Sequence, residues 1–181
     1  AKAQTVQVHN RPTLDQKTGE SYLALRRWAD AEKAFTRSLE TNPIGRDPHL
    51  GLARCYLGQR RPGKALKAAT AAVGLVYASP AGHFLCGRAL QALRRRDEAI
   101  AAYQTAVAQN PVYPEAHLRL STLFARAGDP VRAEQHRQYA EASSQRIEAV
   151  RHGSAIPQDV DLDLDVDLTR ETGVGEWMRS S

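Results

Sequence analysis

Small and large apolar residues recur along this chain with a period of 34 residues. Alanine occurs at positions 31, 65, 99 and 133, and no insertion interrupts the spacing. A small residue stands twelve positions before each alanine and seven positions after it, and a large ring or aliphatic residue stands nine positions before it. This period predicts stacked helical hairpins, because antiparallel helices approach closely only where their side chains are small. We call each set of equivalent positions a column. The small residues before the alanines are Gly19, Ala53, Gly87 and Ser121; the large residues are Tyr22, Tyr56, Leu90 and Phe124; and the small residues after the alanines are Ser38, Ala72, Ala106 and Ala140.

The period predicts two helices in each repeat. Three dipeptides place a capping residue directly before a proline that suits the first turn of a helix: Asp47-Pro48, Ser79-Pro80 and Asp129-Pro130. A single hairpin cannot bury its own apolar face, so the hairpins must stack on one another. We expect first helices near 13–25, 47–59, 81–93 and 115–127, and second helices near 28–41, 62–75, 96–109 and 130–147.

A further set of residues follows the first three alanines by twelve positions: Pro43, Tyr77 and Pro111. With these residues included, the 34-residue pattern resembles the tetratricopeptide repeat over residues 12–147. The resemblance implies an all-α fold class, namely a right-handed superhelical solenoid of antiparallel helix pairs. Outside the region of resemblance we expect an N-terminal lead at 1–11 and an acidic, extended C-terminal tail at 148–181. The final helix is polar, with Arg137 in the slot of Phe35, which suits a solenoid end that no further repeat covers. The four expected repeats are 12–45, 46–79, 80–113 and 114–147.

In the family that this chain resembles, the first helix of each repeat lines a concave groove. Arg54 and Arg88 then stand side by side on adjacent helices, with apolar residues around them. Guanidinium groups make charge-assisted hydrogen bonds to carboxylates, so we expect the groove to bind an extended protein segment that carries acids and apolar anchors. In the alternative interpretation, the arginines form a solvated surface and pair with local acids. The candidate groove residues are Lys17, Leu50, Arg54, Leu57, Phe84, Arg88, Gln91 and Arg119.

Two narrower resemblances lead to different functions. Family members that clamp the C-terminal carboxylate of heat-shock chaperones use a lysine and an asparagine in the first repeat, and here these positions hold Gln16 and Glu20. A receptor for chaperone tails is therefore not expected. Residues 74–77 and 80–83 are similar to repeats attached to bacterial phosphodiesterase-type hydrolases. The alternative function is thus an accessory domain excised from a larger bacterial enzyme.

The net charge of +5 hides an uneven distribution. Residues 151–181 carry seven acids against three arginines, a net charge of −4, which leaves about +9 on the rest of the chain. From position 159 to position 168 acids alternate with aliphatic residues, which resists helix formation and puts all acids on one side of an extended strand. We hypothesise that residues 159–178 occupy the groove of the same molecule or of a neighbour, giving autoinhibition or self-association; the alternative is a solvated tail. The expected ligand residues are Asp161, Asp163, Asp165, Trp177 and Met178.

Arginines also gather at the turn inside the first three repeats, at positions 26–27, 60–61 and 94–96. Stacked hairpins would align these arginines along one edge, where they could bind a polyanion. However, positive charge at the end of a helix is favoured by the helix dipole, and no aromatic residues are interleaved for base stacking. Nucleic acid is therefore a disfavoured partner.

His49, His83 and His117 form another column with the same period. Neighbouring helices lie about 8–10 Å apart, whereas zinc requires each ligand nitrogen within about 2.1 Å of the ion. We therefore expect these rings to fill space between helices rather than to bind a metal. Cys55 and Cys86 lack disulfide or metal spacing and are expected to be small buried residues.

The sequence contains no arrangement that we expect to catalyse a reaction. The Ser143-Ser144 pair and the column histidines fall on different helices, and Gly173-Val174-Gly175 lacks the strand and helix of a phosphate-binding loop. We therefore predict no enzyme activity, no cofactor and no metal. No apolar run approaches the roughly 20 residues of a membrane span, so we expect no membrane insertion and a cytoplasmic location. Because the sequence begins at Ala1 rather than at Met, we expect a fragment of a longer protein.

Overall fold

The computed structural model describes the backbone of residues 2–152 and the side chains of residues 13–152. These residues form eight α-helices and no strand, which confirms the all-α prediction. In chain order the helices are α1 Lys2–Ala24, α2 Trp28–Thr41, α3 Arg46–Gly58, α4 Pro62–Leu75, α5 Pro80–Ala92, α6 Arg96–Gln109, α7 Pro114–Arg126 and α8 Pro130–Arg151.

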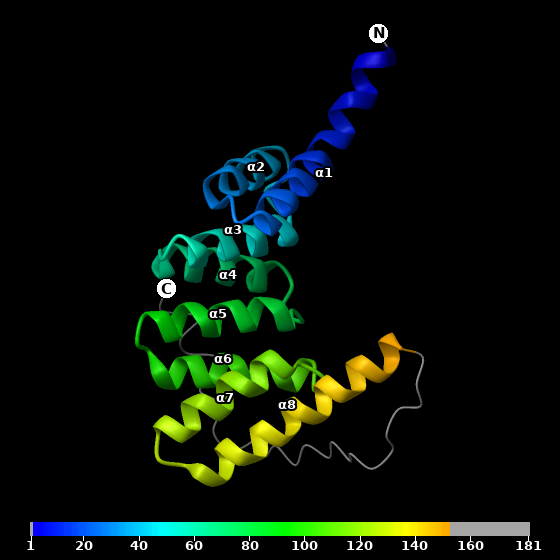
Figure 1. The fold of residues 1–181 in the computed structure, drawn as a ribbon. Helices are drawn as coiled ribbons and strands as arrows, with labels where there is room; N and C mark the ends of the chain where they lie inside the picture. The colour runs from blue at the N-terminus through cyan, green and yellow to red at the C-terminus, as the bar shows by residue number, and fades with distance from the viewer. Residues whose placement is uncertain (1, 153–181) are drawn as a thin grey trace. The chain divides into compact units, whose positions relative to one another are not determined.

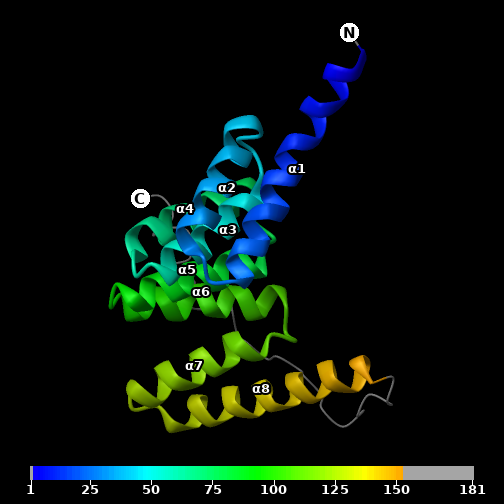
Figure 2. The same ribbon diagram turned by 45° about the horizontal axis from the view of Figure 1, so that its top comes forward.

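The chain divides into two compact units, residues 1–95 and residues 96–181. In the first unit α3 packs against both α1 and α5, so these three first helices form one layer. The second layer consists of α2, which packs on α1 and α3, and α4, which packs on α3 and α5. The N-terminal half of α1 extends past α2 in both Figure 1 and Figure 2. In the second unit α7 packs against α6 and α8.

The helix bounds follow the predicted repeat, with differences at the two ends of the described chain. Helix α1 begins at Lys2, so residues 2–11, predicted as a lead, belong to this helix. The first helix, predicted near 13–25 from the repeat, is therefore longer at its N-terminal end than expected. Helix α8 continues to Arg151, and its last turn is held by the Glu148 carboxylate, which contacts Arg151 at 3.0 Å and His152 at 2.7 Å.

Two of the three predicted N-caps are confirmed. The Ser79 hydroxyl accepts a hydrogen bond from the Gly82 amide at 3.3 Å, at the start of α5. The Asp129 carboxylate accepts one from the Arg132 amide at 2.9 Å, at the start of α8. Each bond satisfies one of the amides that a helix N-terminus leaves unpaired.

The predicted cap at Asp47 is wrong. Helix α3 begins one residue earlier, at Arg46, so Gly45 takes the N-cap position and no side chain caps the helix. Asp47 lies inside the first turn and pairs with Arg46 at 2.8 Å. Pro48 still fits this turn, because an amide there has no partner within the helix.

The small-residue columns allow the helices of the first unit to approach one another closely. The Phe35 ring of α2 is 1% exposed, and it lies against Gly19 of α1 and Gly51 of α3. A Cβ atom added at Gly19 would stand 2.7 Å from this ring, and one added at Gly51 would also stand under 3.0 Å from it. The alanine column and the small column that follows it are buried as well: Ala31, Ala65, Ala99 and Ala133, and Ser38, Ala72, Ala106 and Ala140.

The turn inside each repeat has one backbone geometry. At the end of α1 the Arg26 amide donates to the Leu23 carbonyl at 3.0 Å, and the Arg27 amide donates to the Tyr22 carbonyl at 2.9 Å. This pair of bonds is the Schellman motif, which needs a left-handed residue at its centre. Arg26 has φ 55°, although this region costs an L-residue about 1–2 kcal/mol. The other central residues are Arg60 at φ 58°, Arg94 at φ 63° and Gly128 at φ 80°.

The histidine column connects each first helix to the link that precedes it. A ring nitrogen, Nε2, donates a hydrogen bond to the carbonyl oxygen six residues earlier in all three cases. At the part-buried His83 and His117 the ring does more than fill space, because a carbonyl in a short link needs a donor once it is shielded from water. The pairs are His49 with Pro43 at 3.4 Å, His83 with Tyr77 at 3.0 Å, and His117 with Pro111 at 3.0 Å.

A buried histidine pair joins α7 to α8. His117 donates from Nε2 to the Pro111 carbonyl, so its Nδ1 can accept a hydrogen bond from Nδ1 of His136 at 3.0 Å. The His136 ring is stacked on Phe124, with 5.5 Å between the ring centroids. Burial, together with the charges of His117 and Arg132, lowers the pKa of His136 to about 4, and burial also lowers the pKa of His117. Both rings are therefore neutral at pH 7.

Gly51→Ala should destabilise the chain, because the new methyl group collides with the Phe35 ring. Overpacking costs about 1–3 kcal/mol, which exceeds the gain of at most about 1 kcal/mol from alanine in a helix. We expect a lower urea midpoint, measured by circular dichroism. Gly74→Ala is the matched control, since α4 leaves open space there, and its midpoint should stay equal or rise. Equal midpoints for the two variants would contradict the close packing.

Acidification should destabilise the protein partly through His136. An unfolded histidine takes up a proton near pH 6.5, whereas the folded His136 does so only near pH 4. The unfolded state therefore binds more protons between these values, and the free energy of unfolding falls as the pH drops through this window. In His136→Gln the urea midpoint should fall less between pH 7 and pH 5 than in the unaltered chain. An identical fall in both proteins would show that His136 is not buried in its neutral form.

Candidate peptide-binding surface

The predicted groove residues lie on the first helices, as the repeat requires. In the first unit they stand on the layer formed by α1, α3 and α5, and we call this surface the groove face. Lys17 and Arg54 are exposed, and Arg119, which lies on α7 in the second unit, is exposed too. The other groove-face residues except Leu50 are half-buried: Leu57 on α3, and Phe84, Arg88 and Gln91 on α5.

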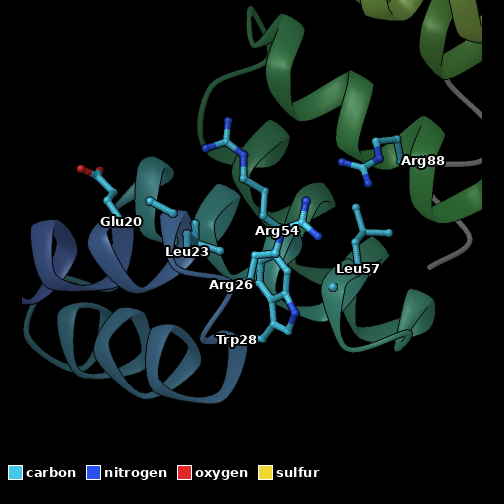
Figure 3. Close-up of a pocket in the computed structure, with 9 residues that line it drawn as sticks. Glu20, Leu23, Arg26, Trp28, Arg54, Leu57 and Arg88 are labelled. Carbon is cyan, nitrogen blue, oxygen red and sulfur yellow. The ribbon is translucent and has the colours of Figure 1, made fainter.

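An open cavity of about 590 Å³ brings part of this set together (Figure 3). Arg54 and Leu57 enter it from α3, and Arg88 enters it from α5. The two arginines that the sequence singled out therefore border one hollow rather than pointing to opposite sides. The full lining is Glu20, Leu23, Ala24, Arg26, Trp28, Arg54, Leu57, Gly58 and Arg88.

One predicted apolar contact is wrong. Leu50 was expected to form part of an apolar pocket for a ligand, but its side chain is only 7% exposed. Helix α3 is flanked by α1 on one side and by α5 on the other, so a residue that the repeat assigns to the groove can still be covered by neighbouring helices. The accessible apolar surface beside Arg54 and Arg88 includes Leu23, Leu57 and Trp28.

Two residues of the cavity that carry large side chains were missed by the sequence analysis. Arg26 comes from the turn between α1 and α2, and Trp28 is the first residue of α2. The Trp28 ring lies directly on Gly58, where a Cβ atom would stand 2.6 Å from it. The sequence does distinguish the position of Arg26, because arginine recurs at this turn position in three repeats whereas the last repeat has Gly128.

In the first two turns the arginine that follows Arg26 or Arg60 contacts a tyrosine ring and an acid of the protein itself. Arg27 lies over the Tyr22 ring, 4.7 Å from its centroid, and pairs with Asp30 at 2.7 Å. Arg61 likewise lies over the Tyr56 ring at 5.4 Å and forms an ion pair with Glu32 at 3.6 Å. These contacts order the turn, so the predicted row of arginines does not act as one uniform basic edge.

The remaining chemical groups fit structural roles. Both cysteines are buried, and burial raises the pKa of Cys55 to about 12 and that of Cys86 to about 11, which keeps the thiols protonated. Residues 13–152 contain no group of three or more histidine, cysteine or acidic side chains that could hold a metal ion. No helix in the described part of the chain is long and apolar enough to cross a membrane. The predicted tail ligand, Asp161, Asp163, Asp165, Trp177 and Met178, lies outside the described residues.

The fold is similar to that of several solved tetratricopeptide proteins. A thermophilic protein of this kind from Thermus thermophilus has a TM-score of 0.68 and 24% identity, with 76% of each chain covered. MamA from Desulfovibrio magneticus RS-1 has a TM-score of 0.66 and 21% identity over 81% of this chain and 79% of that one. The first tetratricopeptide domain of Spaghetti (RPAP3), solved with the HSP90 peptide SRMEEVD, has a TM-score of 0.64 and 18% identity over 66% of this chain and 94% of that one.

Sequence comparison gives the family directly. No curated protein is detectably similar in sequence over the chain. The sequence profile of the tetratricopeptide repeat, in contrast, matches residues 17–82 and 85–147. This match covers most of the chain and includes the four alanines of the repeat. The chain therefore belongs to the tetratricopeptide repeat family, whose members generally act as protein–protein interaction modules.

Proposed function

We propose that the groove face binds an extended segment of a partner protein that carries both acidic and apolar side chains. The observation that carries the proposal is the shared cavity of Arg54 and Arg88, with Leu23 and Leu57 in its walls. Arginines on adjacent helices suit carboxylates that are spaced along an extended chain. The leucines provide apolar surface for the aliphatic residues between those carboxylates.

The groove positions of the first repeat, Gln16 and Glu20, favour a ligand other than a chaperone tail. The solved RPAP3 domain carries an HSP90 peptide, and the carboxylate clamp of family members that bind such tails consists of a lysine and an asparagine. Here Gln16 donates a hydrogen bond to the Glu20 carboxylate at 3.0 Å. A carboxylate at this position repels a terminal carboxylate, so the acids of the ligand should lie nearer to Arg54 and Arg88.

The tail of this chain is a candidate ligand with the right composition. Residues 159–168 alternate acids with aliphatic side chains, and Trp177 and Met178 follow as apolar anchors. The tail carries a negative charge and the rest of the chain a positive one, so electrostatic attraction favours an encounter between them. Occupancy of the groove face by the tail, within one molecule or between two, would regulate access for other partners.

Charge reversal on the groove face should weaken peptide binding. The double variant Arg54→Glu and Arg88→Glu replaces two attractive charges with two repulsive ones. We expect its Kd for a labelled peptide of residues 159–178 to rise at least about tenfold, equivalent to about 1.4 kcal/mol, in fluorescence anisotropy with the full chain.

The matched control is Lys33→Glu with Lys67→Glu. These two exposed lysines lie on α2 and α4, outside the cavity, and their reversal changes the net charge by the same amount. The control should retain most of the affinity. Equal weakening by both double variants would mean that net charge, and not the groove face, controls binding.

Removal of residues 153–181 should test the role of the tail. If the tail occupies the groove face, its deletion raises the affinity for the added peptide of residues 159–178. If the contact joins two molecules, the deletion also lowers the molar mass measured by light scattering. Asp161→Asn, Asp163→Asn and Asp165→Asn, combined in the full-length chain, should reproduce both effects. Unchanged affinity and unchanged mass in the deletion variant would exclude the tail as a ligand.

A further inference from the structure

The cavity on the groove face holds a third arginine that the acidic-peptide proposal does not use. Arg26 reaches the cavity from the turn after α1, whereas Arg54 and Arg88 come from α3 and α5. In Figure 3 these three side chains come from three separate elements, and the Glu20 carboxylate points away from them. Among the described residues, three cations thus surround one hollow that has a single acid in its lining.

Two of the cavity arginines, Arg26 and Arg54, differ from the neighbouring arginines in their acidic partners. Among residues 13–152 the ion pairs of this region involve the neighbouring arginines, Arg27 with Asp30 and Arg61 with Glu32. No described acid forms an ion pair with Arg26 or Arg54. The two guanidinium groups therefore keep their donors available for a ligand.

The turn after α1 places the Arg26 side chain at the cavity. The φ of 55° at Arg26 lies in the left-handed region, which sterically favours glycine, and Gly128 occupies the equivalent turn of the last repeat. The fold accepts the strained residue here, and the side chain of that residue lines the cavity. Arg60 and Arg94 have the same backbone geometry but do not line this cavity, so the position of the Arg26 side chain, and not the strain, carries the argument.

The shape and charge of the cavity fit a group with more oxygen atoms than a carboxylate. One guanidinium group already pairs with both oxygens of a carboxylate. A phosphoryl group on a side chain carries three terminal oxygens and a charge of about −2 at neutral pH. Arg26 and Arg54, which form no ion pair with a described acid, attract a group of this charge. The Trp28 ring, held against Gly58, and Leu57 offer apolar contact to the carbon atoms that carry the phosphate.

We infer that the cavity formed by Arg26, Arg54 and Arg88 recognises a phosphorylated side chain of the peptide that occupies the groove face. The inference rests on the proposed function, because the peptide backbone delivers the phosphate to the cavity. Phosphorylation of the partner then strengthens its binding, and Arg26 is the residue that distinguishes a phosphate from an ordinary carboxylate.

The test uses three peptides with the sequence of residues 159–168 that differ at one position. The first keeps aspartate at 163, the second carries Asp163→Ser, and the third carries phosphate on that serine. Binding to the full chain is measured by isothermal titration calorimetry. We expect the affinity to increase from serine to aspartate to phosphoserine, with a gain of at least tenfold at the last step, equivalent to about 1.4 kcal/mol.

The variant Arg26→Gly removes the side chain and relaxes the turn at the same time. It should lose the gain from phosphate, weaken binding of the serine peptide much less than binding of the phosphopeptide, and raise the urea midpoint. The matched control is Arg60→Gly, which relaxes the same kind of turn at φ 58° but lies outside the cavity lining. This control should raise the midpoint and keep the full gain from phosphate.

The outcomes separate the two proposals. Binding of the aspartate peptide without any gain from phosphate, or an unchanged gain in Arg26→Gly, would overturn the phosphate inference and leave the acidic-peptide proposal intact. Absence of binding by every peptide would overturn the proposed function itself. Inorganic phosphate that binds as tightly as the phosphopeptide would mean that the cavity is a site for free anions, which also contradicts the inference.

Discussion

The close approach of three helices around the Phe35 ring is the contact on which the first unit depends. Gly19 and Gly51 have no side chains, so α1 and α3 can both lie against one face or edge of the ring. Their neighbours on the same helices, Glu20 and Arg54, then reach a common surface. The groove face is thus a consequence of the packing, because residues one repeat apart become neighbours only when their helices touch.

The turns link this packing to the chemistry of the cavity. Each Schellman motif reverses the chain within a few residues and requires a left-handed centre. In the second unit this centre is Gly128, the residue with the lowest conformational cost. In the first unit it is arginine, and at Arg26 the side chain enters the cavity. One position thereby serves the fold through its backbone and the candidate site through its guanidinium group.

Most of the helical architecture was predictable from the sequence, because the period of 34 residues fixes equivalent positions without reference to any single helix signal. The predictions were wrong at two helix starts and at one groove position. Asp47 is a good capping residue, yet α3 begins before it at Arg46. The repeat predicted a first helix near 13–25, yet α1 begins at Lys2. Leu50 belongs to the groove column but is covered by neighbouring helices. A periodic pattern gives the direction of a side chain and not the extent to which its neighbours cover it.

The sequence by itself determined the family, the succession of helices and the two groove arginines, because these follow from the spacing of residues along the chain. It also showed the histidine column, but not that each ring binds a carbonyl six residues earlier. Only the tertiary structure decided that Arg26 and Trp28 border the same cavity as Arg54 and Arg88. Arg26 lies in a turn and Trp28 at the start of a second helix, so neither belongs to a groove column. Their side chains meet the groove face through the packing of α2 against α3, which no linear pattern contains.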